Sequence, residues 1–245
     1  MCDTCGCGDP EIVPVEVQEK ILSDNDHRAA HNREHFRGAG VYSLNLMGSP
    51  GSGKTALLEA TAARFGGERK LGAVSGDLAT DNDGERLNRA GILSKTITTG
   101  SACHLDARLV HRALHELPWK DLDYFVIENV GNLVCPAIYD LGQEVNVVAL
   151  SVTEGEDKPL KYPVMFQKAD LVLLTKIDLV PHLPGLDVGL LRDNVAKVMP
   201  TAAVLEVSAV TGEGVDGWIE WLEARRTERM GEGTAEAAAV AAAGA

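Results

Sequence analysis

The chain has 245 residues, 45% of them hydrophobic, and a formal net charge of −13 at pH 7, so it can form a packed core. The negative charge argues against nucleic acid or an anionic membrane surface as a partner, and no apolar run reaches the roughly 18 residues that span a bilayer. The first residues lack the basic and apolar regions of a signal peptide, so we expect a cytoplasmic protein with five reduced cysteines.

Three cysteines, Cys2, Cys5 and Cys7, stand at the start of the chain. A segment this short and polar cannot bury thiols in a core, and thiolates bind metals such as Zn²⁺, Cu⁺ and Ni²⁺. If Met1 is removed, the amine of Cys2 becomes a fourth ligand, and three sulfurs with one nitrogen in a plane suit Ni²⁺. We predict a metal-binding segment and linker over residues 1–16, with an accidental cluster or redox-active thiols as the alternative.

A strongly polar helix is predicted over residues 17–36. Its histidines, His27, His31 and His35, occur at i, i+4 and i+8 and therefore share one face. Such a stripe could handle metal, but no carboxylate or thiol completes a ligand set. We interpret it as the solvated face of a charged helix.

The sequence GSPGSGKT, residues 48–55, matches the phosphate-loop pattern G-x4-G-K-S/T. An apolar strand over 41–47 precedes it and a helix over 56–65 follows, which is the context that the motif requires. The glycines let backbone N–H groups point at phosphate oxygens, Lys54 carries charge to the terminal phosphates, and the Thr55 hydroxyl can ligate Mg²⁺. A chance glycine-rich turn is the alternative. The candidate nucleotide-binding residues of this loop are Gly48, Gly51, Ser52, Gly53, Lys54 and Thr55.

A carboxylate follows the next apolar strand, which is predicted over residues 71–75. Asp77 ends this strand beside the phosphate loop, where it can hold Mg²⁺ or its waters. Asp81 and Asp83 lie close by and are equally suited to cap a helix. A further strand is predicted over residues 94–99.

The sequence Glu128-Asn-Val-Gly131 follows a compact apolar strand over residues 124–127. Phosphate-loop proteins sense the terminal phosphate and the metal at this position. We predict that Glu128 holds Mg²⁺ directly or through water and that the Gly131 N–H contacts the γ-phosphate. Cys135 is four residues further on, so a backbone that moves when the phosphate leaves also moves a thiol.

Cys103, His104 and Cys135 provide two thiolates and an imidazole, one ligand short of a closed tetrahedral metal site. Water or a second subunit across a two-fold axis could complete the site. The alternative is that both cysteines are small buried hydrophobic residues. His111 and His115 lie off the apolar stripe of the helix that follows and are expected to be solvated.

The sequence Thr175-Lys-Ile-Asp178 follows a buried strand over residues 171–174 and matches the guanine-reading pattern Asn/Thr-Lys-x-Asp. The Asp178 carboxylate can accept both donors of the guanine edge, whereas adenine offers a lone pair there, so GTP is favoured over ATP. Lys176 is expected to pack its stem against the base, and Thr175 replaces the commoner Asn. A loop after a strand over 204–207 is expected to back guanine O6 with an N–H group; its residues are Ser208 and Ala209.

Strands alternate with helices from residue 41 to residue 230, with a further strand over 144–152 and a last helix over 217–230. This order predicts an α/β phosphate-loop NTPase fold with a mostly parallel sheet flanked by helices on both faces, and a nucleotide at the carboxyl ends of the strands. We expect a GTPase domain with a leading helix over residues 17–230. The alanine-rich tail, residues 231–245, is predicted to be disordered or a frayed helix.

Five segments together resemble the HypB family of hydrogenase nickel-incorporation GTPases, from Cys2 to about Arg226: CDTCGCG, GSPGSGKT, ENVGNLVCP, TEGEDKPLKYP and TKIDL. The resemblance implies a metallochaperone of the dimerising SIMIBI class, with GTP favouring the homodimer. It implies nickel on the N-terminal cysteines and a second Ni²⁺ or Zn²⁺ site in the GTPase domain. It also implies a HypA-type metallochaperone and the precursor of the NiFe-hydrogenase large subunit as partners. The long histidine-rich segment of some members is absent, which argues against bulk nickel storage.

Hydrolysis is assigned to Lys54, Thr55, Asp77 and Glu128. No catalytic Gln or Arg finger is evident, so unaided turnover should be slow, on the order of minutes or longer. Three other functions stay open. A urease-accessory GTPase usually has Cys-Pro-His near the sensor, whereas Ala137 follows Cys135-Pro136 here. A metal-storage or sensing protein would bind nucleotide without turnover, and a small-molecule kinase is disfavoured by the guanine pattern.

Overall fold

The computed structural model describes residues 15–77, 82–100, 104–201 and 203–243, with side chains described for residue 20 and, within these ranges, for residues 22–231. The candidate ligands Cys2, Cys5, Cys7 and Cys103 therefore lie outside the described residues. Among the described residues, no helix combines the length and apolar character needed to cross a bilayer.

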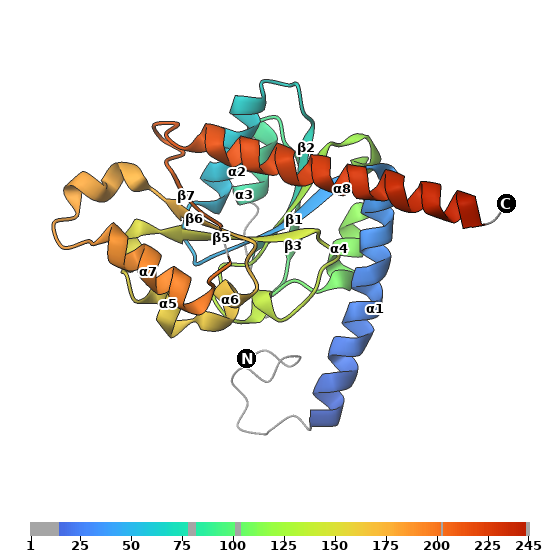
Figure 1. Cartoon of the computed structure of the whole chain (residues 1–245), viewed down its shortest axis with the longest axis horizontal. Helices are drawn as coiled ribbons and strands as arrows, with labels where there is room; N and C mark the ends of the chain where they lie inside the picture. The colour runs from blue at the N-terminus through green and yellow to red at the C-terminus, as the bar shows by residue number, and fades with distance from the viewer. Residues whose placement is uncertain (1–14, 78–81, 101–103, 202, 244–245) are drawn as a thin grey trace.

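One sheet of seven parallel strands forms the centre of the molecule (Figure 1). Its strands are, in spatial order, β3 (Leu93–Thr98), β2 (Leu71–Asp77), β4 (Tyr124–Glu128), β1 (Tyr42–Met47), β5 (Val145–Ser151), β6 (Leu171–Thr175) and β7 (Ala203–Val207). Every strand pair is parallel. Parallel strands need crossover connections, which here are mostly helices and cover the sheet. The predicted α/β fold is confirmed.

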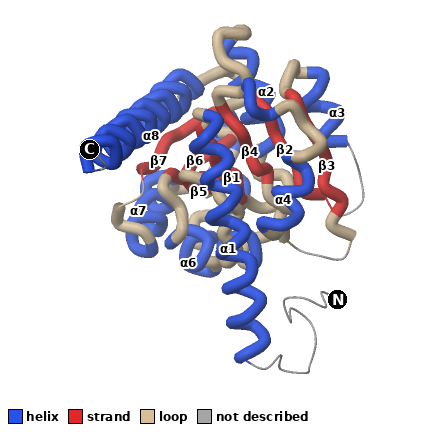
Figure 2. Tube along the Cα trace, turned by 90° about the vertical axis from the view of Figure 1, so that its right-hand side faces the viewer, coloured by secondary structure: helices blue, strands red, loops and turns tan. Residues whose placement is uncertain are grey.

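Helices cover both faces of the sheet (Figures 1 and 2). One face packs against α2 (Lys54–Phe65), α3 (Asn82–Arg89) and α8 (Val215–Ala243). The other face packs against α1 (Val15–Ala39), α4 (Ala107–Leu114) and η1 (Trp119–Asp121) on one half, and α6 (Pro163–Gln167) and α7 (Val188–Val198) on the other. The shorter connecting helices are η2 (Cys135–Ala137), η3 (Val152–Glu154), α5 (Lys158–Lys161) and η4 (Ile177–His182).

The alternation of side chains along β1 explains this division. Leu44 and Leu46 enter the cluster under α2 and α8, whereas Ser43 and Asn45 point to the opposite face, where they are buried. The Asn45 Nδ2 donates to Asn146 Oδ1 at 3.1 Å, so its amide is paired inside the protein. Ser43 and Asn45 can therefore be buried on this otherwise apolar face of the sheet, because buried polar groups are tolerated when they are hydrogen-bonded.

The register aligns the carboxyl ends of the strands at one edge. Leu46 and Ser75 both pair with Glu128, and Ser151 and Val207 both pair with Thr175. The loops that leave these strands therefore meet at one edge, which is where ligands bind in open parallel sheets.

The long helix α1 is held against α4 by buried amides. Asn32 Nδ2 donates to Ala107 O at 2.8 Å and to Leu141 O at 3.1 Å. Gly142 (φ +91) is required beside it, because a Cβ there would lie 2.5 Å from the Asn32 Cβ. At the other terminus, α8 continues to Ala243, so most of the tail predicted to be disordered or a frayed helix is helical. The domain limits at residues 16 and 230 stay predictions.

Candidate nucleotide and metal sites

The phosphate loop runs from the end of β1 to the start of α2. A Cβ on Gly48 would lie 2.4 Å from Ala149 O and 2.7 Å from Ser52 Oγ, so only glycine fits there. Gly53 caps α2 in the left-handed region at φ 95, which glycine adopts without steric cost. The Ser52 Oγ is buried and has no hydrogen-bond partner among the described residues. A loop with these close approaches and an unpaired hydroxyl is suited to an oxygen-rich ligand such as phosphate.

Lys54 lies over this loop and is 8% exposed. Its Nζ donates to Gly48 O at 3.2 Å and to Ser49 O at 3.1 Å. Burial lowers the pKa of Lys54, and the carboxylates of Glu128 and Asp83 oppose that shift. The ammonium is therefore held at the centre of the loop by acceptors on two sides, in a position from which it can reach a bound phosphate.

Two carboxylates converge on the Thr55 hydroxyl. The Thr55 Oγ1 lies 2.7 Å from Glu128 Oε1 and 3.1 Å from Asp83 Oδ1. Glu128 is 2% exposed, and its Oε2 has no hydrogen-bond partner among the described residues. Burial raises the pKa of Glu128, and the hydrogen bond from Thr55 and the charge of Lys54 oppose the shift. Hard oxygen ligands around a buried, unpaired carboxylate oxygen fit Mg²⁺.

Of the aspartates near this site, the structure places Asp83 on the Thr55 hydroxyl, whereas the sequence favoured Asp77 as the magnesium ligand. Asp77 ends β2 at the same edge, and Thr99 N donates to its backbone carbonyl at 2.9 Å. Its side chain stays a predicted magnesium ligand. Asp83, which the sequence left as a possible helix cap, lies in the first turn of α3 with its carboxylate on the Thr55 hydroxyl. Asp81 lies outside the described residues.

The segment predicted to read guanine, residues 175–178, is tied directly to the phosphate loop. Thr175 Oγ1 donates to Ser52 O at 2.6 Å, and Lys176 Nζ donates to Gly51 O at 2.6 Å. The hydroxyl of Thr175, which stands where Asn is commoner, thus links this segment to the phosphate loop. Lys176 has φ 60, and it is the one non-glycine residue with positive φ among the described residues.

Ser208 holds the carboxylate predicted to read guanine. Its Oγ donates to Asp178 Oδ1 at 2.5 Å and accepts from the backbone N–H groups of Val210 and Thr211. Ala209 lies in the same turn and is half-buried. This contact leaves Asp178 Oδ2 for another donor. The roles of Asp178, Ser208 and Ala209 in base recognition stay predictions.

A further carboxylate, which the sequence reasoning missed, joins the phosphate loop to the segment after β5. Glu154 Oε2 accepts from Ser49 Oγ, while Glu154 Oε1 accepts from Ser151 N at 3.0 Å. Lys158 Nζ lies 3.5 Å from the same carboxylate. The TEGEDK sequence that contains Glu154 carried a signal, but its contact with the loop arises only from the packing.

The segment predicted to sense the terminal phosphate, residues 128–135 (here called the sensor segment), lies against the phosphate loop. A Cβ on Gly131 would lie 2.9 Å from Pro50 N and 2.8 Å from Pro50 Cγ, so this contact requires glycine. Gly48 and Asn132 form an isolated antiparallel bridge next to it. The phosphate loop is therefore in direct contact with the segment that leads to Cys135.

Asn129 connects the sensor segment to the candidate ligand His104. The Asn129 side chain is 1% exposed. Its Nδ2 donates to Asn45 Oδ1 at 3.1 Å, and its Oδ1 accepts from Val130 N at 3.0 Å and from Leu105 N at 3.4 Å. Because Leu105 follows His104 directly, one buried amide spans the end of β4 and the start of the segment that carries the imidazole.

His104 and Cys135 are both buried, at 5% and 4% exposure. The His104 ring stacks on Tyr139, with ring centroids 4.0 Å apart, and Tyr139 lies four residues after Cys135. Burial lowers the pKa of His104, so the imidazole is neutral and can ligate a metal near pH 7. The third predicted ligand, Cys103, lies outside the described residues. This metal site and the site of Cys2, Cys5 and Cys7 stay predictions.

Comparison with known proteins gives consistent results. Residues 43–206 match the family described as "CobW/HypB/UreG, nucleotide-binding domain". The hydrogenase maturation factor HypB of Azotobacter chroococcum mcd 1 is 48% identical over 216 residues, 88% of this chain and 70% of that protein. The hydrogenase maturation factor HypB of Escherichia coli K12 is 45% identical over 212 residues, 86% of this chain and 73% of that protein.

Two crystal structures share the fold. Hydrogenase maturation factor HypB from Archaeoglobus fulgidus is 41% identical with a TM-score of 0.78, and the match covers 84% of this chain and 100% of that chain. HypB from Helicobacter pylori in complex with nickel is 40% identical with a TM-score of 0.79, and the match covers 84% and 96%.

Proposed function

Because this chain belongs to the hydrogenase maturation factor HypB family within the CobW/HypB/UreG group, we propose that it is a GTP-hydrolysing nickel chaperone for NiFe-hydrogenase. In this proposal the nucleotide state controls metal binding and dimerisation. The reaction is attack of water on the γ-phosphate, which breaks the bond to the β-phosphate oxygen and yields GDP and phosphate.

The residues at the sheet edge support the proposed hydrolysis. Lys54 neutralises charge on the β- and γ-phosphates, and the Gly131 N–H contacts the γ-phosphate. Thr55, Glu128 and a strand-end aspartate would hold Mg²⁺, which would supply positive charge for phosphoryl transfer when bound. The short tie from Ser208 orients Asp178 for guanine. Hydrolysis is slow in this proposal because no side chain at this edge is assigned to activate the water.

The observation that carries the proposal is the buried amide of Asn129. It bonds to the backbone on both sides of the path from nucleotide to metal, at Val130 and at Leu105. A shift of the sensor segment on loss of the γ-phosphate is thus transmitted to His104, while Cys135 shifts with the same segment. Ni²⁺ is the cargo, ligated by Cys103, His104 and Cys135, with Zn²⁺ as a competing ion.

Exposed apolar side chains support a subunit contact near these ligands. Val134 and Ile138 flank η2 and are 43% and 47% exposed, and Leu160 and Val164 are 46% and 42% exposed. Such exposure favours an interaction surface. We propose that GTP favours a homodimer through this region, and that a HypA-type chaperone and the precursor of the hydrogenase large subunit are its other partners, in the cytoplasm.

The proposal is tested by phosphate release and oligomeric mass measured on the full chain. We expect slow release from Mg-GTP, at least about a hundredfold preference over Mg-ATP, and a doubled mass with a non-hydrolysable GTP analogue. Nickel from the loaded protein should also reach a hydrogenase large-subunit precursor. No phosphate release, with nickel retained, would identify a storage or sensing protein instead. Delivery to a urease but not to a hydrogenase would support the other maturation function.

A further inference from the structure

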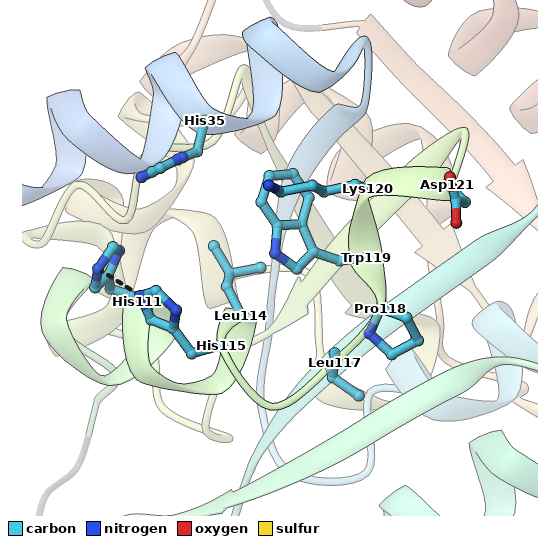
Figure 3. Close-up of a pocket in the computed structure, with 9 residues that line it drawn as sticks. All are labelled: His35, His111, Leu114, His115, Leu117, Pro118, Trp119, Lys120 and Asp121. Carbon is cyan, nitrogen blue, oxygen red and sulfur yellow. Dashed lines mark hydrogen bonds between the residues drawn. The ribbon is translucent and has the colours of Figure 1, made fainter.

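A cluster of histidines on the outer flank of α1 and α4 has no part in the proposed nucleotide chemistry. His31 and His35 come from α1, and His111 and His115 come from α4. The ring centroids of His31 and His35 are 4.3 Å apart, and those of His31 and His111 are 5.3 Å apart. One ring nitrogen of each of these three histidines lies within 4.8 Å of the other two. Figure 3 shows His35, His111 and His115 from this group.

The structure changes the interpretation of both histidine pairs. The sequence predicted a solvated face on the first helix, because no carboxylate or thiol completes a set with its histidines. It predicted solvated His111 and His115, because they lie off the apolar stripe of their helix. Packing of α1 on α4 turns the two faces toward each other. His35 and His111 are half-buried, and His31 and His115 are exposed at the rim. The histidines of α1, which have no further ligand nearby in the sequence, thereby lie next to the histidines of α4.

Asn32 fixes the tautomer of His111. The His111 Nδ1 lies 3.0 Å from Asn32 Oδ1, a contact between residues 79 apart in the chain. Both hydrogens of the Asn32 amide are used, on Ala107 O and Leu141 O. The Asn32 oxygen can therefore only accept, so His111 Nδ1 carries the hydrogen and Nε2 keeps its lone pair. A metal-ligating histidine is commonly oriented in this way through its other ring nitrogen.

The Nε2 of His111, which keeps its lone pair, faces His115. His111 Nε2 lies 3.1 Å from His115 Nε2, and the rings are nearly perpendicular with centroids 4.7 Å apart. Four ligands at about 2.0–2.1 Å from a tetrahedral metal are themselves about 3.4 Å apart. The ligand nitrogens of His31, His35 and His111 lie within 4.8 Å of one another, and His115 Nε2 lies 3.1 Å from His111 Nε2. Rotation of the imidazoles can therefore bring a ligand set to this spacing.

We propose that His31, His35 and His111 bind one divalent transition-metal ion, with His115 or water as the fourth ligand. Neutral imidazoles suit Zn²⁺, Ni²⁺ and Co²⁺, and a closed set without thiolates is unsuited to Cu⁺. The amide of Asn32 serves as the orienting group behind His111. The site is chemically distinct from the cysteine-containing sites, because all of its protein ligands are nitrogen.

The position of the cluster suggests what the site is for. A groove between α1 and α4 is lined by both His31 and His111 and also by His104 and Tyr139. An ion held by the cluster can reach His104 along this groove without leaving the protein surface. This role as a holding site for the cargo rests on the proposed function, whereas the metal site itself does not.

Metal stoichiometry of the full chain tests the site. Co²⁺ is the probe, because thiolate ligation gives intense charge-transfer absorption and an all-imidazole site gives only weak visible bands. Ni²⁺ stoichiometry is measured in parallel by equilibrium dialysis. We expect the His31→Gln/His111→Gln variant to lose one equivalent of either ion while it keeps the full thiolate absorption. His182→Gln, which removes an exposed histidine on η4, is the matched control and should lose nothing.

Two results would overturn the site: unchanged stoichiometry in the double variant, or an equal loss of the thiolate absorption, which would mean that the histidines only support the cysteine ligands. The single variant His31→Gln guards against misfolding, because this side chain is exposed, and it should weaken the extra equivalent by at least about tenfold. The two proposals fail separately. If the double variant keeps its full metal stoichiometry while nickel binding depends on GTP, the histidine site is wrong and the proposed function stands. If the double variant loses one equivalent while nickel binding does not depend on GTP, the histidine site stands and the proposed function fails.

Discussion

The carboxyl edge of the sheet and the α1–α4 flank collect polar groups in different ways. At the edge, each group lies at or just after the end of a strand whose position is fixed by parallel register. Glu128 and Thr175, for example, each pair with a neighbouring strand on both sides. At the flank, His35 and His111 belong to two helices and meet only through packing. The edge buries charged groups such as Lys54 and Glu128 and gives each of them hydrogen bonds. The flank leaves the rings of His35 and His111 partly exposed.

This difference determines how large an effect we expect from a substitution in each region. Charged groups at the edge, such as Lys54 at 8% exposure and Glu128 at 2%, lie where electrostatic effects are strong. The flank should contribute little to folding until a metal binds, because its imidazoles are only partly buried and binding to the folded state is what would stabilise it. The predictions below probe that contrast.

The largest effect is expected at Lys54. Lys54→Ala removes the charge aimed at the phosphates, and GTP hydrolysis should fall about a thousandfold or more, as for other removals of a charge that stabilises phosphoryl transfer. Lys168→Ala, an exposed lysine after α6, is the control and should leave phosphate release unchanged. A Lys54→Ala protein with normal turnover would show that the loop does not perform this chemistry.

Base selectivity should change next most strongly. In Asp178→Asn the side chain loses one acceptor and gains a donor, so the preference should shift from guanosine to xanthosine triphosphate by about a hundredfold or more. Competition binding with the two nucleotides measures the shift. Asp193→Asn, on the exposed side of α7, should not change the ratio. If selectivity were the same in both variants, Asp178 would not be the base reader.

Glu128 should show opposite effects on stability and on activity. Burial raises the pKa of Glu128 in the folded state above the ordinary 4.5. Between pH 4.5 and the folded-state pKa the native state binds more protons than the unfolded state, so the free energy of unfolding decreases as the pH rises through this range. At pH 7 the carboxylate therefore costs stability without metal. Glu128→Gln should raise Tm by about 2–4 °C, the shift that 1 kcal/mol produces in a chain of this size.

The same variant should lower Mg²⁺-dependent hydrolysis at least about tenfold, because the carboxylate no longer holds the cation. Thermal melts with and without Mg²⁺ and phosphate release measure the two effects. Glu68→Gln, an exposed glutamate between α2 and β2, should change neither. A lower Tm in the metal-free variant would contradict the buried-charge argument.

The smallest effect is a pH dependence shared by the edge and the flank. Burial lowers the pKa of His104, and burial together with neighbouring imidazoles lowers those of His35 and His111, below the ordinary 6.5. The unfolded chain then binds more protons below about pH 6.5, so metal-free stability should fall as the pH falls. Melts at about pH 7.5 and about pH 5.5 measure this.

The decrease in Tm caused by these three histidines should be only a few degrees, given the size of the chain. His104→Gln should reduce it more than His111→Gln, because His104 is more deeply buried. Equal reductions would contradict the contrast between edge and flank.

What could be predicted from the sequence follows the same contrast. The seven strands and the loops after them carry contiguous patterns, so the fold was predictable, and so was the placement of residues 48–55 and Glu128 at the carboxyl ends of the strands. The contact of Glu154 with Ser49 and that of Asp83 with Thr55 depend on how loops fold back, which the sequence does not encode locally. The proximity of the histidines of α1 to those of α4 could not be predicted, because it arises from the packing of two helices that Asn32 and Gly142 hold together.

The claim on which the account depends is that the nucleotide state controls metal binding through the segment shared by Glu128, Asn129 and Cys135. The most direct test is Ni²⁺ affinity in the His31→Gln/His111→Gln variant, loaded with either GDP or a non-hydrolysable GTP analogue, so that the flank does not contribute. We predict that the two nucleotide states differ at least about fivefold in affinity, and that Asn129→Ala reduces the difference. The same affinity in both states would contradict the coupling and leave a GTP-binding protein whose metal sites act independently of it.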